Sequence, residues 1–414
     1  MKFETYPIDA NIKKNLVKMG LKRPTDIQYK AIPSVLKGED VLAIAHTGTG
    51  KTAAFAVPVI DKIQRVKSSK TSYGIHCIVM VPTRELAVQI YEVFRSLCKK
   101  TRVKPFVVIG GVDQDNQINH LTKGIDILIA TPGRMFDLIS QKAIDVRRVK
   151  ILVLDEADQM LDKGFIKDIQ SIKRKLKQRH QTLFFSATIN KEIKKLAFSQ
   201  VRSSAIRIQI SPDDPVSKNV AHYVVFVEMD DKRFFLRRFI REHSEKKIMV
   251  FVRTTVRAER VAKALARKNI DALTIYGQKD QDQRLDVMER FKADDQKILI
   301  ATDVSARGID IPNVDYVVNY DLPDQKEVYV HRIGRTGRGR SKGSAVSFCS
   351  EGERPLLEDI EGFLDKKIEK ISMDRDEYTL TVDVLDGPDS IQEMIRANED
   401  WEKKRKKKAR RKRR

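Results

Sequence analysis

Short runs of apolar and β-branched residues recur along the chain, and each is followed by a turn or by a polar stretch with helix-like spacing. Parallel strands that are buried on both faces read as continuous apolar runs, so these segments are predicted as strands of an α/β fold. In the first half they are Val41–Ala45, Cys77–Val81, Phe106–Ile109, Ile125–Ala130, Ile151–Leu154 and Thr182–Phe185, and the run Ile206–Ile210 precedes the end of this half. In the second half they are His222–Val227, Ile248–Val252, Ala272–Tyr276, Lys297–Ala301, Tyr316–Asn319 and Ser344–Phe348. The second half therefore repeats the architecture of the first.

Two prolines within Ser211–Pro215 separate the two sets of strands, because they forbid a continuous helix or a central strand. A chain of 414 residues with 41% hydrophobic content is too long for one ordinary core. We predict two domains, residues 1–210 and 219–373, joined by a linker at 211–218. Residues 374–402 are rich in acidic residues and are predicted as a partly ordered extension, and residues 403–414 as a basic disordered tail.

The formal net charge is +23, and eleven of the last twelve residues are Lys or Arg, which leaves +12 for residues 1–402. A basic body with a basic tail points to a polyanionic partner, because neutralising phosphates releases counterions. The alternative for the tail is solubility or contact with an acidic membrane surface. Three widely spaced cysteines give no disulfide or zinc pattern, and we find neither a signal peptide nor a membrane-spanning run, so a cytoplasmic protein is expected.

A candidate phosphate-binding loop, Ala45–Thr52, follows a predicted strand and precedes the helix-compatible Ala53–Ile63. In such a loop, small residues let backbone N–H groups approach phosphate, Lys51 reaches the β- and γ-phosphates, and the Thr52 hydroxyl ligates Mg²⁺. The first position is Ala rather than Gly, and the alternative is a Gly-rich turn between strand and helix. The candidate phosphate-binding residues are Thr47, Gly48, Thr49, Gly50, Lys51 and Thr52.

A run of carboxylates, Asp155–Asp158, ends the apolar strand Ile151–Leu154. In a nucleotide site, Asp155 would hold Mg²⁺, directly or through water, and Glu156 would orient and deprotonate the attacking water. A helix N-terminal charge cluster is the alternative when the run is taken alone.

Taken together, these motifs resemble those of the DEAD-box RNA helicases, and the match extends from Phe3 to Arg338. The resemblance implies an α/β chain of two tandem RecA-like domains, each a parallel sheet flanked by helices, with ATP and Mg²⁺ bound and RNA as the partner. Upstream, Pro24–Gln28 resembles the adenine-recognition segment of the family. This implies that Gln28 reads the adenine edge and that Phe3 supplies an apolar or aromatic contact.

The second half resembles the part of the family that completes the nucleotide site. Arginines at intervals of three in His331–Arg338 suit a helix start or a turn that aims several guanidinium groups at one phosphate. By resemblance, Arg335 and Arg338 are arginine fingers that stabilise charge on the γ-phosphoryl group, and Asp310 approaches the ribose. The alternative is a basic, RNA-facing helix without a catalytic role.

The resemblance also places RNA-binding and coupling residues in loops beyond strand ends. Such loops expose backbone N–H groups, hydroxyls and guanidinium groups, although similar segments are also common helix caps and turns. Arg253 departs from the family, which commonly has Asn there. The implied RNA-binding residues are Arg84, Gly111, Thr131, Arg134, Arg253, Gln281, Arg284, Thr302 and Asp303, and the residues that couple hydrolysis to strand separation are Ser186, Thr188 and His331.

The predicted function is therefore RNA-stimulated ATP hydrolysis coupled to closure of the two domains and to local unwinding of RNA duplexes or remodelling of RNA–protein complexes. We expect a monomer without a membrane partner that contacts RNA mainly through its phosphate backbone, possible targets being ribosomal or messenger RNA–protein assemblies. Two alternatives are a DNA helicase or translocase of the same superfamily and a non-catalytic, ATP-gated RNA clamp.

Overall fold

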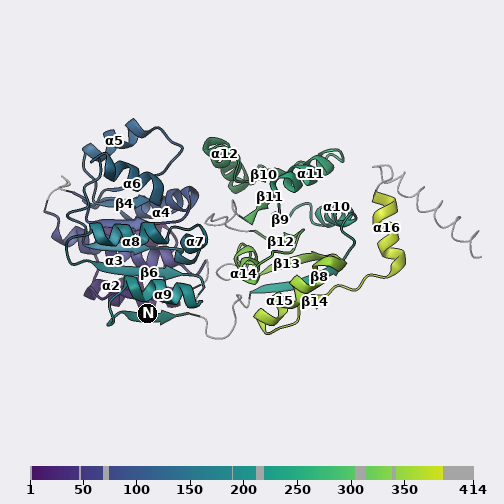
Figure 1. The fold of residues 1–414 in the computed structure, drawn as a ribbon, viewed down its shortest axis with the longest axis horizontal. Coiled ribbons are helices and arrows are strands. Elements are labelled where there is room, and N and C mark those ends of the chain that lie inside the picture. Colours follow the sequence, from purple (N-terminus) through teal and green to yellow (C-terminus); the bar gives the residue numbers. More distant parts are fainter. Residues whose placement is uncertain are drawn as a thin grey trace, which may run out of the picture. The chain divides into compact units, whose positions relative to one another are not determined.

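The structure is a computed structural model that describes residues 2–45, 48–68, 74–188, 190–210, 219–303, 314–337 and 342–385. The chain divides into two units, and within the described residues each contains a seven-stranded, all-parallel sheet with helices packed against it (Figure 1). The predicted tandem RecA-like α/β fold is confirmed.

The sheet of the first unit has the strand order β3-β4-β2-β5-β6-β1-β7. Its residues are buried on both faces over the central strands, which explains why they read as apolar runs. The strands are β1 (Val41–Ile44), β2 (Cys77–Met80), β3 (Pro105–Val108), β4 (Ile127–Ala130), β5 (Ile151–Leu154), β6 (Gln181–Ser186) and β7 (Ile206–Gln209).

Two layers of helices cover the two faces of this sheet, and alternate strand residues point into each layer. Val41 and Ala43 face the first core and Leu42 and Ile44 the second. The first core is covered by η1 (Phe3–Thr5), α1 (Ala10–Lys18), α2 (Asp26–Lys37), α3 (Lys51–Val66) and α4 (Arg84–Leu97). The second is covered by α5 (Gln114–Thr122), α6 (Pro132–Ser140), α7 (Ala157–Asp162), α8 (Ile166–Lys175) and α9 (Lys191–Gln200).

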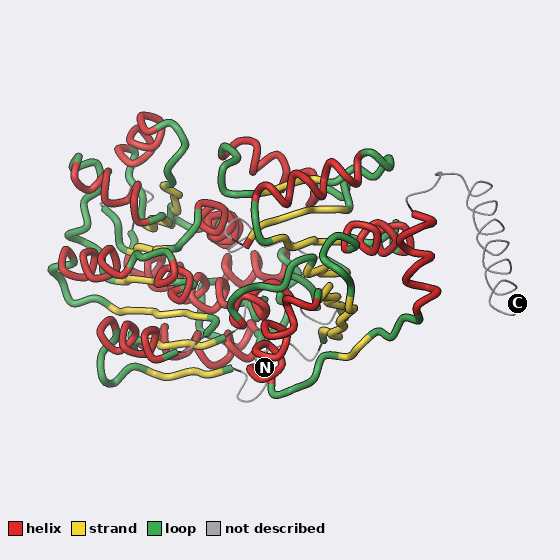
Figure 2. Tube along the Cα trace, turned by 45° about the vertical axis from the view of Figure 1, so that its right-hand side comes forward, coloured by secondary structure: helices red, strands yellow, loops and turns green. Residues whose placement is uncertain are grey.

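The second unit also has helices packed around its strands (Figure 2). Its strand order is β10-β11-β9-β12-β13-β8-β14. Its strands are β8 (Val220–Phe226), β9 (Ile248–Val252), β10 (Leu273–Ile275), β11 (Ile298–Thr302), β12 (Tyr316–Asn319), β13 (Gly343–Cys349) and β14 (Glu369–Lys370). The helices are α10 (Lys232–Glu242), α11 (Thr255–Ala266), α12 (Gln281–Lys292), α14 (Lys326–Ile333), η2 (Glu351–Glu353), α15 (Arg354–Leu364) and α16 (Arg375–Leu385).

Every predicted strand corresponds to an observed strand whose bounds agree within two residues. The short edge strand β14 was not predicted. The first part of the predicted acidic extension forms α16, which packs on α10: the Tyr378 ring lies 5.0 Å from that of Phe235, and the Tyr378 hydroxyl donates to Asp231 at 2.8 Å. The predicted linker at 211–218 and the basic tail at 403–414 lie outside the described residues. Among the residues described here, no helix is long and apolar enough to cross a bilayer.

Candidate nucleotide and RNA site

The carboxyl ends of the parallel strands of the first unit meet at one edge of the sheet, the usual place for ligands in such folds. Strands β1, β6 and β5 are neighbours in the sheet, and they are followed by the phosphate loop, by Ser186–Thr188 and by Asp155–Asp158. The adjoining strands β2, β4 and β3 lead into the segments that carry the predicted RNA contacts. The predicted nucleotide and RNA residues of this unit therefore occupy adjacent halves of one edge.

The phosphate loop joins the end of β1 to the first residue of α3. Gly48 and Gly50 have φ angles of 83° and 90°, a left-handed conformation that side chains other than Gly rarely adopt. Lys51 begins the helix, is 6% exposed, and donates a hydrogen bond from Nζ to the carbonyl oxygen of Ala45 at 2.9 Å. The Lys51 side chain therefore connects the end of the loop, at α3, with its beginning at Ala45. Thr47 falls outside the described residues.

Gln28 links the predicted adenine-recognition segment to the phosphate loop. Its Oε1 accepts from the Thr25 backbone N–H at 3.1 Å, and its Nε2 donates to the carbonyl oxygen of Gly50 at 3.0 Å. A Cβ at Gly50 would lie 2.4 Å from this amide nitrogen. The amide predicted to read adenine therefore also holds the last glycine of the loop.

Phe3 is 3% exposed and packs beside Tyr6, with ring centroids 6.1 Å apart. Together with Val17 and Leu21 it forms the apolar lining of a hollow of about 710 Å³, a volume within the range of small-molecule sites. The cationic residues around this hollow are Lys2, Lys13, Lys14, Lys18, Lys22 and Arg23.

Asp155 and Glu156 form the turn between β5 and α7. Glu156 has φ 52° and ψ 50°, a left-handed conformation that is uncommon for residues other than Gly. The pKa of Asp155 is raised to about 7, mainly by burial; the Lys51 ammonium acts to lower this pKa, and the carboxylates of Glu156 and Asp158 act to raise it. A buried carboxylate in this environment is stabilised in its charged form by a nearby cation.

Asp158 connects these carboxylates to the predicted coupling segment. Its Oδ2 accepts from the backbone N–H of Ala187 at 3.2 Å and from the N–H and hydroxyl of Thr188 at 2.9 and 3.0 Å. Its Oδ1 accepts from the N–H of Gln159 at 3.1 Å, and the Ser186 hydroxyl donates to the Thr188 carbonyl at 2.8 Å. No role was predicted for Asp158, although the third carboxylate of the run and the Ser-Ala-Thr segment are both visible in the sequence.

The four RNA-binding candidates of the first unit meet near the ends of β2, β3 and β4. Arg84 begins α4, and its guanidinium lies against the backbone of Gly111, where a Cβ would be 2.3 Å from Nη1. Arg134 donates to the carbonyl oxygen of Val112 at 3.2 Å, and Thr131 is the N-cap residue of α6. Glycine at 111 therefore makes room for an arginine at the edge where RNA binding is predicted.

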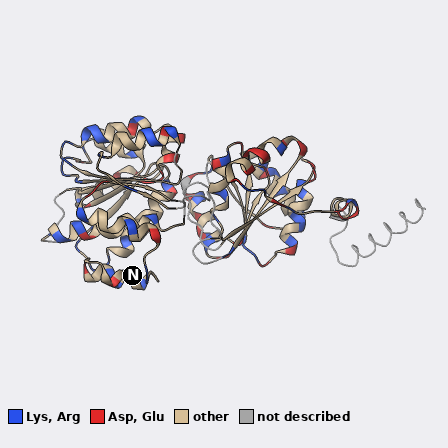
Figure 3. Cartoon of the chain, turned by 90° about the horizontal axis from the view of Figure 1, so that it is seen from below, with Lys and Arg blue, Asp and Glu red and all other residues tan. Residues whose placement is uncertain are grey.

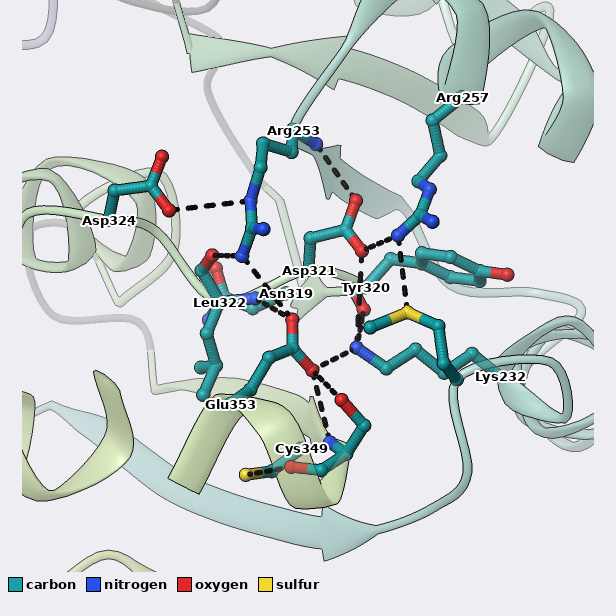
Figure 4. A network of polar contacts seen from close by, with 12 residues as sticks. Lys232, Arg253, Arg257, Asn319, Tyr320, Asp321, Leu322, Asp324, Cys349 and Glu353 are labelled. Atoms are coloured by element: carbon teal, nitrogen blue, oxygen red, sulfur yellow. Dashed lines mark hydrogen bonds and ion pairs between the residues drawn. The ribbon is translucent and has the colours of Figure 1, made fainter. Parts of the chain in front are cut away.

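In the second unit, Arg253 follows β9 and its guanidinium lies among acceptor groups (Figure 4). It donates to the Leu322 carbonyl at 3.2 Å and forms ion pairs with Asp324 at 3.4 Å and Glu353 at 3.6 Å. Its backbone N–H donates to Asp321 at 2.9 Å. The sequence left the orientation of this side chain open, and the structure turns it toward carboxylates; an RNA contact by Arg253 stays a prediction.

A buried lysine lies behind Arg253. The Lys232 side chain is fully buried, and its ammonium donates to the Tyr320 carbonyl at 2.8 Å and to the Glu353 carboxylate, with Asp321 at 3.9 Å (Figure 4). Burial lowers the pKa of Lys232, while Glu353 and Asp321 act in the opposite direction. Glu353 also accepts from the Ser350 N–H and hydroxyl at 3.0 and 2.8 Å. These contacts tie the ends of β12 and β13 to α10.

The segment His331–Arg338 differs in one respect from the expectation that its arginines aim at one phosphate. Arg332 is 2% exposed and forms a two-bond ion pair with Asp303, at 2.6 and 2.8 Å, so its guanidinium is used inside the unit. It is near the end of α14 rather than at a helix start. Arg335 follows the helix, and its Nε donates to the His331 carbonyl at 3.3 Å.

The remaining candidates of the second unit are placed by secondary structure. Thr302 ends β11 opposite Val252 of β9, and Arg284 lies in the first turn of α12. Gln281 begins α12, but its side chain is outside what the structure describes, as are Asp310 and Arg338.

Comparisons with known proteins agree with this arrangement. The sequence matches the family models for DEAD/DEAH box helicase over residues 25–196 and for helicase conserved C-terminal domain over residues 231–340. It is 38% identical to the DEAD-box ATP-dependent RNA helicase RhpA of Helicobacter pylori over 89% of this chain and 73% of that protein. The identity to CshA of Bacillus subtilis is 37%, over 89% of this chain and 74% of that protein.

Solved structures are similar over nearly the same span. Saccharomyces cerevisiae Dbp5 bound to RNA and ADP BeF3 is 29% identical, with a TM-score of 0.81 over 89% of this chain and 95% of that chain. Mss116 bound to ssRNA and UDP-BeF is 29% identical, with a TM-score of 0.82 over 92% and 82%. With two family models in tandem and these relatives aligned over most of its length, the chain belongs to the DEAD-box family of ATP-dependent RNA helicases.

Proposed function

We propose that RNA-stimulated ATP hydrolysis at the carboxyl edge of the first unit drives closure of the two units and local unwinding of RNA duplexes or remodelling of RNA–protein complexes. One observation carries the assignment of residues: the phosphate loop, the buried carboxylates and the Arg84 region follow neighbouring strands of one sheet. Structural changes that accompany ATP binding or hydrolysis at the nucleotide half of this edge can therefore be transmitted to the RNA half across a few neighbouring strands.

The phosphate loop binds the triphosphate in this proposal. Lys51 exchanges its hydrogen bond with the Ala45 carbonyl for the β- and γ-phosphate oxygens, which keep the buried ammonium paired. Backbone N–H groups of the loop and the start of α3 bind further oxygens. Gln28 reads the adenine edge while it retains its bond to Gly50, so base recognition and loop geometry are linked through one amide.

The donor set fits Mg²⁺ at this edge. Thr52 lies in the first turn of α3, and Asp155 is a buried carboxylate within electrostatic reach of Lys51. Because burial raises the pKa of Asp155, a further cation beside it would stabilise its charged form. One hydroxyl and one carboxylate, with waters and phosphate oxygens, suit Mg²⁺. When bound there, the ion neutralises charge on the phosphates.

Glu156 is the proposed base. Glu156 follows Asp155 in a left-handed turn at the start of α7. In this proposal its carboxylate orients and deprotonates the attacking water. Asp158 is a positioning residue, because three of the hydrogen bonds that it accepts join α7 to Ala187 and Thr188. A shift of the carboxylates during hydrolysis would therefore move the predicted coupling segment.

The second unit contributes arginines in this proposal. Arg335 and Arg338 stabilise negative charge on the γ-phosphoryl group, and Asp310 contacts the ribose. Arg332 holds α14 through its ion pair with Asp303, so this carboxylate acts by positioning the helix that Arg335 follows. Turnover then depends on closure, and RNA favours turnover by favouring closure.

The decisive experiment measures ATP turnover with and without single-stranded RNA. The wild-type protein should be stimulated by RNA, and Glu156→Gln should lose turnover while it retains ATP-dependent RNA binding. Glu92→Gln is the matched control and should behave as wild type, because Glu92 forms an exposed pair with Arg95. Equal turnover with and without RNA, or an active Glu156→Gln protein, would contradict the proposal.

We further propose that the protein acts as a cytoplasmic monomer on ribosomal or messenger RNA–protein assemblies. All three cysteines are buried thiols, which suits a reducing compartment. Burial raises the pKa of Cys98 to about 12 and that of Cys349 to about 11, so these thiols stay protonated. Sedimentation with and without RNA tests the monomer, and crosslinking in cells tests the RNA class; a dimer in sedimentation or an absence of such RNA would contradict this part.

A further inference from the structure

The layer formed by α8 and α9 on the first unit carries a concentrated positive charge. Residues 166–207 contain eleven Lys or Arg and two acidic residues, a net charge of +9. These helices contact each other, and Lys173 of α8 donates to the Gln200 carbonyl of α9 at 3.0 Å. Figure 3, in which Lys and Arg are blue, shows basic positions along the helices that cover this unit. The layer is part of the protein that the nucleotide and RNA sites described above do not use.

The charges on α9 form one stripe. Lys191, Lys194 and Lys195 are exposed and stand at positions i, i+3 and i+4 of the helix, which share a face. Phe198 continues the stripe at i+7, is 41% exposed, and has the Arg207 guanidinium 4.7 Å from its ring centroid. Cations in the first turns of a helix oppose its dipole, so this placement does not serve helix stability. Clustered exposed lysines on one face are typical of surfaces that bind phosphate backbones.

The cations of α8 extend the stripe into a patch. Arg174 and Lys175 end the helix, Lys177 and Arg179 follow it, and all four are exposed. Within the described residues, none of these four and none of the three α9 lysines has a carboxylate within ion-pair distance. Some cations elsewhere on the unit are paired, as Lys67 is with Asp126 at 2.6 Å. Neutralisation of the patch is therefore left to an external anion or to counterions.

We propose that this α8–α9 patch is a second RNA surface that binds the phosphate backbone of double-stranded RNA. From Lys191 to Phe198 the helix rises about 10 Å, a length over which a duplex presents about six phosphates. A single exposed aromatic ring, already covered by a guanidinium, offers no series of stacking positions for an unpaired strand. Closely spaced lysines without base-reading groups suit a duplex, because double-stranded RNA is recognised by shape and phosphate contacts. The surface would hold the duplex next to the part that is being unwound.

The test compares Lys191→Gln/Lys194→Gln/Lys195→Gln with a matched control, Lys30→Gln/Lys37→Gln/Lys99→Gln. The control removes three exposed lysines from the opposite helical layer of the same unit. Binding of a blunt RNA duplex of about 16 base pairs is measured without nucleotide between about 50 and 200 mM salt. All proteins are full length, so the basic tail contributes equally to each.

Three lost phosphate contacts should lower the salt slope by about 2.7 and weaken duplex binding at least about 10-fold at the lowest salt. ATP turnover at saturating single-stranded RNA should stay at the wild-type level, which separates this inference from the proposed function. Unchanged duplex binding, or an equal loss in the control, would overturn the proposal. So would a loss of binding to phosphatidylserine vesicles with duplex binding intact, because the patch would then serve a membrane surface.

Discussion

The substitution Asp158→Asn tests most directly whether the hydrogen bonds between the carboxylate run and Ser186–Thr188 couple hydrolysis to unwinding. Four groups donate hydrogen bonds to this side chain: three act on Oδ2, from Ala187 and Thr188, and the fourth is the Gln159 N–H on Oδ1. A carboxylate accepts on both sides, whereas an amide accepts on one side only. Asparagine must therefore turn its NH₂ group toward at least one buried donor.

The cost follows from these contacts. One buried donor left without an acceptor costs about 1–3 kcal/mol, and the remaining bonds lose their charge assistance, about 1 kcal/mol in all, which gives about 2–4 kcal/mol. If the link between α7 and the Ser-Ala-Thr segment transmits hydrolysis to unwinding, this is a loss of about 30- to 1000-fold in coupling. The change leaves Lys51 and the phosphate loop untouched, so ATP binding should be retained.

The assay counts RNA duplexes unwound per ATP hydrolysed, with far-UV circular dichroism to show that the variant is folded. Asp145→Asn is the control: it removes one carboxylate from an exposed loop, where the pair with Arg147 is screened by solvent. A folded Asp158→Asn protein that unwinds as many duplexes per ATP as the wild type would refute the reasoning.

Two further substitutions examine the buried network and the phosphate loop. Lys232→Met leaves the Glu353 carboxylate buried without its ammonium and should lower the free energy of unfolding of the second unit by about 3–5 kcal/mol in urea titrations. Lys232→Met/Glu353→Gln should recover part of this loss, and an equally unstable double variant would contradict the pairing. Gly50→Ala places a Cβ 2.4 Å from the Gln28 amide in a left-handed backbone, and we expect ATP binding to weaken at least about 10-fold, since breaking that hydrogen bond alone costs about 1.5 kcal/mol. Gly20→Ala has the same backbone requirement, φ 74°, but open space around it, so nucleotide titration of this control should match the wild type.

The strands and the edge could be predicted because they depend on local signals. Ile151–Leu154 lies between helices on both faces, and burial from both sides leaves an apolar run that needs no other context. Asp155 and Glu156 follow this strand directly, so they lie at the edge of the sheet where the strand ends. In contrast, β14 consists of the exposed residues Glu369 and Lys370 and has no apolar signal. Helix α16 docks mainly through partly buried positions such as Tyr378 and Val382, which an acidic composition concealed.

The contacts of the arginines could not be predicted, because they depend on residues that are distant in the sequence. Arg253 meets Asp324 and Glu353 only after β9, β12 and β13 are aligned, and no periodicity relates these positions. The same holds for Arg332: its motif suggested a phosphate, while the fold supplies Asp303. A motif thus identifies which residues lie at the ligand-binding edge. Which of these residues bind a ligand, and which stabilise the protein from inside, depends on how the folded chain packs.

The left-handed turn at Glu156 has a consequence for the evolution of the protein. A residue with a Cβ pays about 1–2 kcal/mol for this conformation, and glycine would avoid that penalty. Replacing the proposed base by glycine should therefore relieve backbone strain while abolishing hydrolysis. At this position, selection for stability and selection for turnover act in opposite directions, and a lineage released from the need to hydrolyse ATP would be free to lose the carboxylate first.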